Sequence, residues 1–298
     1  MHVGTVEVEG ARLGYRIEGE GQPCLVVGSA TYYPRVFGPE LREHLQLVFV
    51  DVRHFAASDP SFGPDRISIE TYPDDIERVR KELGLGDVVV IGHSIHGVIA
   101  LEYARRYPEH VLGVVAIGAP ASRSHEDPSP SRRLWEAEAS EERKELVARN
   151  LEELTPEVRA TLSPGELWVR EYVASGPMIW FDPTYDANWL FEGVALDGPV
   201  FQRVRELFTP YDLAQGPGAI TVPVLVVHGR YDYFAAYTLW EEQRHKLPRH
   251  TYVLFERSGH TPPLEEPERF DETLLAWIRG LTSPAPAEDR FRENLFGT

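Results

Sequence analysis

Residues 88–100 of the chain read Val88-Val89-Val90-Ile91-Gly92-His93-Ser94-Ile95-His96-Gly97-Val98-Ile99-Ala100. A continuous apolar run is followed by a glycine, a serine and a stretch with helical apolar spacing, which predicts a buried strand, a tight turn and a helix. Such a turn exposes the Ser94 hydroxyl at the carboxyl end of a sheet and points the Ile95 N–H toward the same place. The helix N-terminus adds positive potential there. We therefore predict that Ser94 is a nucleophile.

Further apolar runs indicate the rest of the fold. Continuous runs fit parallel strands that are covered on both faces, and they occur at 25–27, 47–50, 88–91, 114–117 and 224–227, with a last strand at 252–255. Residues 5–8 and 13–17 instead alternate polar and apolar side chains, as a half-exposed antiparallel pair does. Helical stretches are expected at 69–83, 95–107 and 270–278. We predict an α/β fold with a mostly parallel central sheet of about eight strands and helices on both faces.

One long segment carries no strand pattern. About 100 residues separate the run that ends at Ile117 from the next strand, which starts near Val222, and a structureless loop of that length is improbable in a compact domain. The segment is charged over 131–153 and rich in aromatic residues further on. We expect a helical cap at 121–214, inserted in a core formed by 1–120 and 215–282, and a C-terminal tail at 283–298.

The strand–turn–serine–helix motif resembles that of the α/β-hydrolase family, and within it the proline-iminopeptidase-like and esterase branch. The family pattern is G-x-S-x-G, and here His96 replaces the last glycine while Gly97 keeps the next position small. A second family signature, D-x-R-G-x-G-x-S, is matched in part by Asp51-Val52-Arg53-His54-Phe55-Ala56-Ala57-Ser58, which loses both glycines. The resemblance spans roughly residues 5–280, and it implies the α/β-hydrolase fold.

The resemblance also implies a triad in the chain order serine, acid, histidine. A serine hydroxyl is a weak nucleophile that needs a base and a group that orients the base. The strand at 224–227 leads into Gly229-Arg230-Tyr231-Asp232, which resembles the family's G-x-x-D turn, and the last strand leads into Gly259-His260. Asp232 and His260 are the expected acid and base. With Ser94, they follow the carboxyl ends of strands, where sites in open α/β sheets form.

An oxyanion hole of two backbone N–H groups is a further implication of the resemblance. Ile95 is expected to supply one, and the loop after the strand at 25–27 the other, with Ala30 preferred over Ser29. Relatives often have His-Gly in this loop, where the chain has Gly28-Ser29. The aromatic residues of the expected cap form either its own core or an apolar pocket wall. The residues expected to line a substrate pocket are Ser29, His96, Trp180 and Trp189, and His54 is a further unusual residue that could line it.

Composition and charge exclude several classes of partner. Forty-seven acidic and 30 basic residues give a formal net charge of −17, which repels phosphate backbones and argues against nucleic acid. No run of about 18 apolar residues occurs, so no membrane span is expected, and the N-terminus lacks the pattern of a secretory signal. The single cysteine, Cys24, lies in an apolar run, and nothing indicates an oxidising compartment. We expect a cytoplasmic monomer or homodimer with a small-molecule substrate.

Sequence motifs of cofactor-dependent and metal-dependent enzymes are missing. Gly84-Leu85-Gly86 precedes a strand rather than following one, so it is not a dinucleotide fingerprint. There is no Walker loop and no H-E-x-x-H, and the histidines lack metal-ligand spacing. We expect neither a cofactor nor a metal.

The favoured function is therefore a cofactor-independent serine hydrolase that acts on a small ester or lactone through an acyl-enzyme on Ser94. The alternatives are a proline-iminopeptidase-like aminopeptidase or amidase, lyase or other chemistry on the same triad, and a non-catalytic ligand receptor on the same fold. The peptidase relatives hold the substrate amine with cap acids, for which Glu171 and Glu192 are candidates by position only. The Gly28-Ser29 loop lacks the His-Gly-Gly-Pro-Gly pattern of those peptidases.

Overall fold

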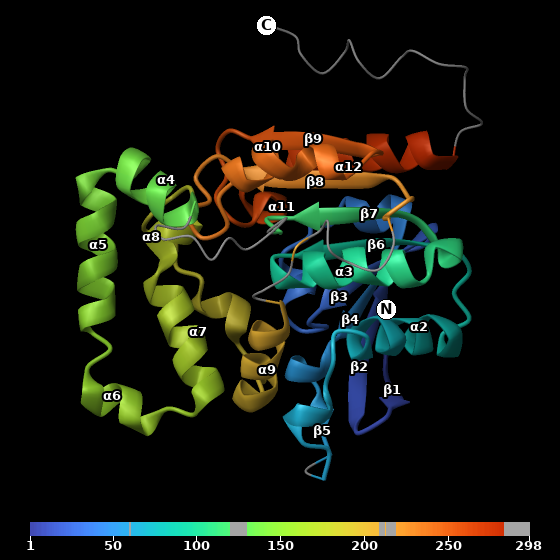
Figure 1. The fold of residues 1–298 in the computed structure, drawn as a ribbon, viewed down its shortest axis with the longest axis horizontal. Helices are drawn as coiled ribbons and strands as arrows, with labels where there is room; N and C mark the ends of the chain where they lie inside the picture. Colours follow the sequence, from blue (N-terminus) through green and yellow to red (C-terminus); the bar gives the residue numbers. More distant parts are fainter. Residues whose placement is uncertain (60, 120–129, 209–211, 213–218, 283–298) are drawn as a thin grey trace, which may run out of the picture.

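The computed structural model of the chain describes residues 1–59, 61–119, 130–208, 212 and 219–282 (Figure 1). A single sheet forms its centre, in the order β1-β2-β4-β3-β6-β7-β8-β9, with β5 pairing to β2. The strands are β1 His2–Val8, β2 Ala11–Glu18, β3 Gln22–Gly28, β4 Leu45–Asp51, β5 Ala57–Ser58, β6 Val88–His93, β7 Val111–Ile117, β8 Val224–Gly229 and β9 His250–Phe255. The predicted α/β fold is confirmed.

Strand direction follows the hydrophobic pattern. The alternating strands β1 and β2 pair antiparallel, and β2 pairs antiparallel with β4. The continuously apolar strands β4, β3, β6, β7 and β8 are parallel neighbours, and β9 adds to the far edge in parallel. Parallel pairing directs the carboxyl ends of these strands to one edge of the sheet, so the loops that follow them meet there.

Helices cover both faces of the sheet. Alternate residues of one strand serve two separate cores, since Leu25 and Val27 of β3 pack on one face while Cys24 and Val26 pack on the other. Helices α2 (Thr71–Glu82) and α3 (Ile95–Arg106) lie on the first face, and α1 (Leu41–His44) and α12 (Pro267–Thr282) on the second. Burial on both faces explains why these strands are apolar throughout.

Six helices occupy the described part of the segment between β7 and β8, as predicted from its missing strand pattern. Figure 1 shows them gathered beyond the ends toward which the parallel strands point. They are α4 Pro130–Glu138, α5 Glu141–Glu152, α6 Pro156–Thr161, α7 Pro164–Ala174, α8 Gly176–Ile179 and α9 Gly198–Phe208. Residues 121–129, 209–211 and 213–214 of the expected cap lie outside the described residues, as does the expected tail at 283–298.

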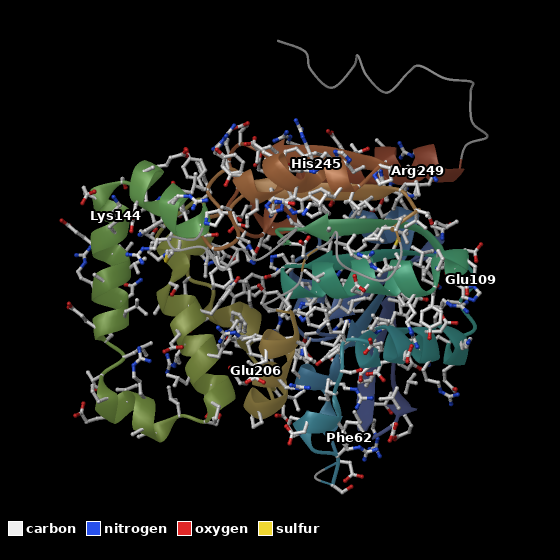
Figure 2. All side chains as sticks on the ribbon, viewed as in Figure 1. Phe62, Glu109, Lys144, Glu206, His245 and Arg249 are labelled. Atoms are coloured by element: carbon white, nitrogen blue, oxygen red, sulfur yellow. The ribbon has the colours of Figure 1, made fainter. Side chains whose placement is uncertain are left out.

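Short elements complete the chain. They are α10 Thr238–Gln243 and α11 Pro262–Glu265, with the 3₁₀ turns η1 Tyr33–Arg35, η2 Arg53–Phe55, η3 Pro64–Arg66, η4 Pro108–His110, η5 Asn188–Phe191 and η6 Arg244–Lys246. Among the described residues, no helix is both long and apolar enough to cross a bilayer. Charged side chains such as Glu109, Lys144 and Glu206 lie at the periphery (Figure 2), where water solvates them.

Candidate active site

Ser94 occupies a strained turn between β6 and α3. Its φ of 55° and ψ of −127° make it the one non-glycine residue with positive φ among the described residues. Its N–H donates to Ile117 O of the neighbouring strand at 2.8 Å, and its carbonyl accepts from Gly97 N at 3.0 Å. A backbone of this kind costs about 1–3 kcal/mol and persists only where its surroundings enforce it. The predicted strand–turn–helix around Ser94 is present.

Two glycines allow this turn, and His96 does not disturb it. A Cβ at Gly92 would overlap His96 O, and a Cβ at Gly97 would lie 2.5 Å from Ala119 Cβ. Close approach of helix to strand therefore depends on positions 92 and 97. The side chain of His96 instead extends toward β3, with Nδ1 3.1 Å from where a Cβ on Gly28 would stand. The histidine side chain therefore fits at position 96, where the G-x-S-x-G pattern of the family has its last glycine.

Asp232 and His260 form a buried pair. Asp232 Oδ2 lies 2.7 Å from His260 Nδ1, and the two residues are 0% and 1% exposed. Asp232 Oδ1 accepts from the N–H groups of Phe234 and Ala235 at 3.0 and 2.7 Å. Because a carboxylate accepts the proton of Nδ1, the lone pair of His260 belongs to Nε2. That Nε2 atom is buried and has no partner among the described residues.

His260 lies beside the turn that carries Ser94. The rings of His260 and His93 have centroids 4.5 Å apart, and His93 Nε2 is 2.9 Å from His260 O. A Cβ on Gly118 would come within 2.9 Å of His260 Nδ1, and Ile117, which precedes Gly118, accepts the Ser94 N–H. His93, which precedes Ser94, therefore contacts His260. The end of β7, where Ile117 accepts the Ser94 N–H, also lies against His260.

The loop that carries His260 is held by Glu265, which sequence reasoning did not single out. Glu265 Oε2 accepts from Gly259 N at 3.0 Å and Phe181 N at 2.7 Å, and Oε1 accepts from Thr261 N at 2.9 Å. Burial raises the pKa of Glu265 to about 7. In addition, His260 N donates to Ile179 O at 2.6 Å. The signal available in the sequence was an acidic residue placed five positions after the histidine.

On the oxyanion side, the N–H of Ala30 donates to Asp51 Oδ1 at 2.7 Å. Its expected role as an oxyanion donor stays a prediction and requires that this hydrogen bond be released. Asp51 ends β4 next to this loop, and burial raises the pKa of its carboxyl to about 6. Ser29 is buried, and its Oγ accepts from the N–H groups of Thr31 and Tyr32. Ile95 is the first residue of α3, where an N–H has no partner within the helix.

The expected pocket residues lie in different environments. Trp180 is buried at the end of α8, against the loop that carries His260. Trp189 is 40% exposed, and its Nε1 donates to the Tyr185 hydroxyl at 3.1 Å, so it lies at the surface of the inserted helices. An aromatic ring beside His260 is that of Phe234, with ring centroids 5.3 Å apart. Phe234 follows Asp232 by two residues, which was its only signal in the sequence.

Across the described ranges, no group of three or more histidine, cysteine, aspartate or glutamate side chains is arranged to hold a metal ion. Cys24 is a free, fully buried thiol whose pKa is raised by burial.

Comparison with known proteins agrees with the fold. The family described as "alpha/beta hydrolase fold" matches residues 23–167. The chain is 36% identical over 277 residues to the AB hydrolase superfamily protein YclE of Bacillus subtilis, covering 92% of this chain and 98% of that protein. The chain belongs to the α/β-hydrolase superfamily, and this membership supports a hydrolase.

More distant relatives include a proline iminopeptidase and an esterase. The chain is 23% identical to the proline iminopeptidase of Clostridium botulinum over 89% of this chain and 93% of that one. The solved structure of a thermophilic esterase from Thermogutta terrifontis aligns with a TM-score of 0.67 and 20% identity, over 95% of this chain and all of that chain. At that identity the structural match shows the fold alone.

Proposed function

We propose that the protein is a cofactor-independent serine hydrolase that cleaves a small carboxylic ester or lactone through an acyl-enzyme on Ser94. The observation that carries this proposal is the strained backbone of Ser94, the one positive φ of a non-glycine residue within the described ranges. Such strain concentrates at functional sites. The turn that carries it adjoins the loop of His260, because His93 Nε2 lies 2.9 Å from His260 O, and His260 Nε2 has no partner among the described residues.

In the first half-reaction, Ser94 Oγ attacks the substrate carbonyl carbon while His260 Nε2 takes the hydroxyl proton. Asp232 keeps the other proton of His260 on Nδ1, which fixes the tautomer that can accept and stabilises the imidazolium. The tetrahedral intermediate then expels the alkoxide, which leaves as the alcohol with the proton from Nε2. The acyl group remains on Ser94.

In the second half-reaction, a water molecule gives a proton to His260 Nε2 and attacks the acyl carbon. Collapse of the second intermediate returns the proton from Nε2 to Ser94 Oγ and releases the carboxylic acid. For a lactone, the alcohol and the acid are the two ends of one product. No redox partner is needed for either step.

The oxyanion is stabilised by the Ile95 N–H at the positive end of α3. A second donor is expected from the turn at Ser29 and Ala30. Since Asp51 accepts the Ala30 N–H, Ala30 can serve only if that bond is released when substrate binds. Ser29 is the alternative donor. Loss of one oxyanion donor typically lowers kcat by about 10²–10³.

We propose that helices α4 to α9 act as a cap over this edge of the sheet and restrict the substrate to small molecules. Aromatic side chains near His260 support an apolar acyl site. Phe234, which is 40% exposed, contacts His260, and the buried Tyr172 lies against Phe234 with ring centroids 6.0 Å apart. Pockets for small molecules are lined mainly by such side chains.

An ester is favoured over an aminoacyl substrate by the state of the candidate amine-binding acids. Glu171 forms an ion pair with Arg159, which neutralises one of them. The main-chain carbonyl of Glu192 accepts from Arg35 at 2.8 Å, so a guanidinium lies at the backbone of the second candidate. A neighbouring guanidinium opposes the binding of a substrate ammonium.

The test is labelling of the purified protein with a fluorophosphonate, followed by mass spectrometry. We expect stoichiometric modification of Ser94 and none in Ser94→Ala. A panel of p-nitrophenyl esters, lactones and aminoacyl amides then ranks substrates by kcat/KM. A protein that resists labelling, hydrolyses no panel member and keeps ligand-induced thermal stabilisation in Ser94→Ala would instead be the non-catalytic receptor.

A further inference from the structure

A chain of hydrogen bonds lies buried next to Ser94 and takes no part in the mechanism above. It is called here the histidine chain and consists of Tyr72, His54, His96, Tyr33 and His93. In this order the successive distances are 3.4 Å from Tyr72 Oη to His54 Nδ1, 3.0 Å from His54 Nε2 to His96 Nε2, 2.9 Å from His96 Nδ1 to Tyr33 Oη and 3.3 Å from Tyr33 Oη to His93 Nδ1. The chain ends on His260, whose carbonyl oxygen is 2.9 Å from His93 Nε2.

The chain joins three departures from the family pattern. His54 and His96 each replace a family glycine, lie 42 residues apart in sequence and stack with ring centroids 5.2 Å apart at 16°. Gly28 stands where relatives often have histidine, and a Cβ there would overlap Tyr33 and come within 3.1 Å of His96 Nδ1. The absent side chain at position 28 thus makes room for the rings of Tyr33 and His96. Three unusual residues form one structural feature.

The protons of the chain can be assigned. All three imidazoles are buried and neutral, since burial lowers the pKa of His96 to about 4 and those of His54 and His93 well below the usual value. A carbonyl only accepts, so His93 carries its proton on Nε2 and accepts at Nδ1 from the Tyr33 hydroxyl.

The positions of the remaining protons follow from the hydroxyl proton of Tyr33. Because Tyr33 donates this proton to His93, its oxygen can only accept from His96, which therefore carries its proton on Nδ1. His96 must then accept at Nε2 from His54. His54 then accepts at Nδ1 from Tyr72. If the hydrogen bonds along the chain ran in the opposite direction, Nδ1 of neutral His93 would have no donor. Only the first arrangement gives every donor an acceptor and every acceptor a donor.

We propose that the histidine chain is a positioning device that holds the main-chain carbonyl of His260 and thereby keeps the imidazole aligned with Ser94. His260 is anchored through its own N–H to Ile179, and its neighbours Gly259 and Thr261 are anchored to Glu265. The chain supplies the remaining anchor, on the side of the nucleophile. This inference rests on the proposed function, because it assigns His260 as the base.

The proton order is tested without any activity measurement. Long-range ¹H–¹⁵N spectra of ¹⁵N-histidine protein report imidazole tautomers directly, with signals assigned from single His→Gln variants. We expect Nε2–H for His54 and His93, the less common Nδ1–H for His96, and no titration of these three between about pH 6 and pH 8. An Nε2–H tautomer for His96, or a protonated ring at any of the three, would overturn the assignment.

The positioning role is tested with Tyr33→Phe, which removes one hydroxyl from the chain. Its matched control is Tyr103→Phe. Tyr103 is equally buried and lies in the C-terminal half of α3, and its hydroxyl donates to Glu77 at 2.9 Å. We expect the downfield Nδ1–H signal of His260 to move in Tyr33→Phe and not in Tyr103→Phe. The rate of Ser94 labelling is expected to fall about tenfold in Tyr33→Phe only, since a displaced base costs up to about 10²-fold.

Conservative rescue separates hydrogen bonding from space filling. His96→Asn keeps a donor near the place of Nδ1, whereas His96→Leu is similar in bulk and has none. We expect kcat for His96→Asn to exceed kcat for His96→Leu by about tenfold. Equal rates for the two variants would refute the positioning role.

The two proposals fail in different ways. If wild-type protein is neither labelled at Ser94 nor active on any ester, the proposed function fails, and the His260 signal in Tyr33→Phe still decides whether the chain holds that residue. If wild-type protein is labelled while Tyr33→Phe reacts at the same rate with an unshifted His260 signal, the function stands and the positioning inference is refuted.

Discussion

Asp232 Oδ2 lies 2.7 Å from His260 Nδ1, although 28 residues separate the two in the chain. Each residue lies in the loop that follows a strand, and the two strands, β8 and β9, are parallel neighbours at one side of the sheet. Parallel pairing therefore brings an acid and a base together that the sequence holds apart. Because both side chains are shielded from water, the contact is electrostatically stronger than it would be at the surface.

Replacement of Asp232 by asparagine tests this contact. An asparagine amide can donate to Nδ1, which favours the tautomer with its proton on Nε2, and that tautomer cannot accept the Ser94 proton. We expect Asp232→Asn to lower kcat by about 10³–10⁴ while the far-ultraviolet circular dichroism spectrum stays unchanged. Ester hydrolysis within tenfold of wild type would contradict the assigned role of Asp232.

The strain at Ser94 predicts a trade-off between activity and stability. Glycine adopts positive φ without steric cost, so Ser94→Gly is expected to abolish ester hydrolysis and raise the free energy of unfolding by about 1 kcal/mol. Ser94→Ala is the matched control, because it also removes the hydroxyl but keeps the Cβ that causes the strain. Urea unfolding of the three proteins measures the difference. Equal stability of the glycine and alanine variants would show that the turn is relaxed.

Close packing of α3 against the sheet predicts a compensating pair. Gly97→Ala places a Cβ 2.5 Å from Ala119 Cβ and is expected to destabilise the fold by about 1–3 kcal/mol. Ala119→Gly removes the opposing atom, so the double variant should recover at least half of the loss despite the added glycine. A double-mutant cycle from thermal or urea unfolding measures the coupling. Additive effects would mean that the two positions do not share this space.

The buried carboxyl of Glu265 predicts a contribution to stability that falls as pH rises, opposite in sign to the contribution of the buried neutral histidines His93 and His96. Burial raises the pKa of Glu265 from 4.5 to about 7, so the folded state binds a proton more tightly than the unfolded state does. The resulting stabilisation is complete below about pH 4.5 and is lost as pH rises through about 7, at roughly 1.4 kcal/mol per pKa unit. Asp51 and Asp271, whose pKa values are raised to about 6 by burial, act in the same direction.

Urea unfolding at a series of pH values between about 4.5 and 8 measures this slope. Glu265→Gln mimics the protonated carboxyl and keeps the buried histidines, so the free energy of unfolding of this variant minus that of wild type is expected to increase from about pH 4.5 to about pH 8. A difference that stays constant or decreases over this window would contradict the prediction.

The sequence was sufficient to predict the sheet and to nominate Ser94, Asp232 and His260 as the candidate triad, because both inferences use local signals. Continuous apolar runs marked the buried parallel strands, and short turns after them marked Ser94, Asp232 and His260. Contacts between distant side chains have no such signal. His54 and His96 were visible as unusual residues, but nothing in either segment indicated that their rings stack.

The acceptor of a backbone N–H group and the exposure of a single side chain were harder to predict, because both depend on contacts between distant segments. The Ala30 N–H is bonded to Asp51, and which acceptor a backbone N–H meets depends on the tertiary arrangement rather than on the residue that carries it. Trp189 shares its residue type with buried Trp180, yet it is 40% exposed. Hydrophobicity alone did not distinguish the two, since a tryptophan can satisfy its ring N–H at the surface as well.

The bond from His260 N to Ile179 O joins the base to the end of α8 in the inserted helices. A Cβ on Gly259 would overlap the same Ile179 carbonyl, so the loop that carries His260 packs directly against the end of α8. Exchange of the whole insertion for that of a relative would remove one anchor of His260 along with the proposed cap. Chimeric proteins made to change specificity should therefore keep residues 176–181 and exchange only the helices on either side.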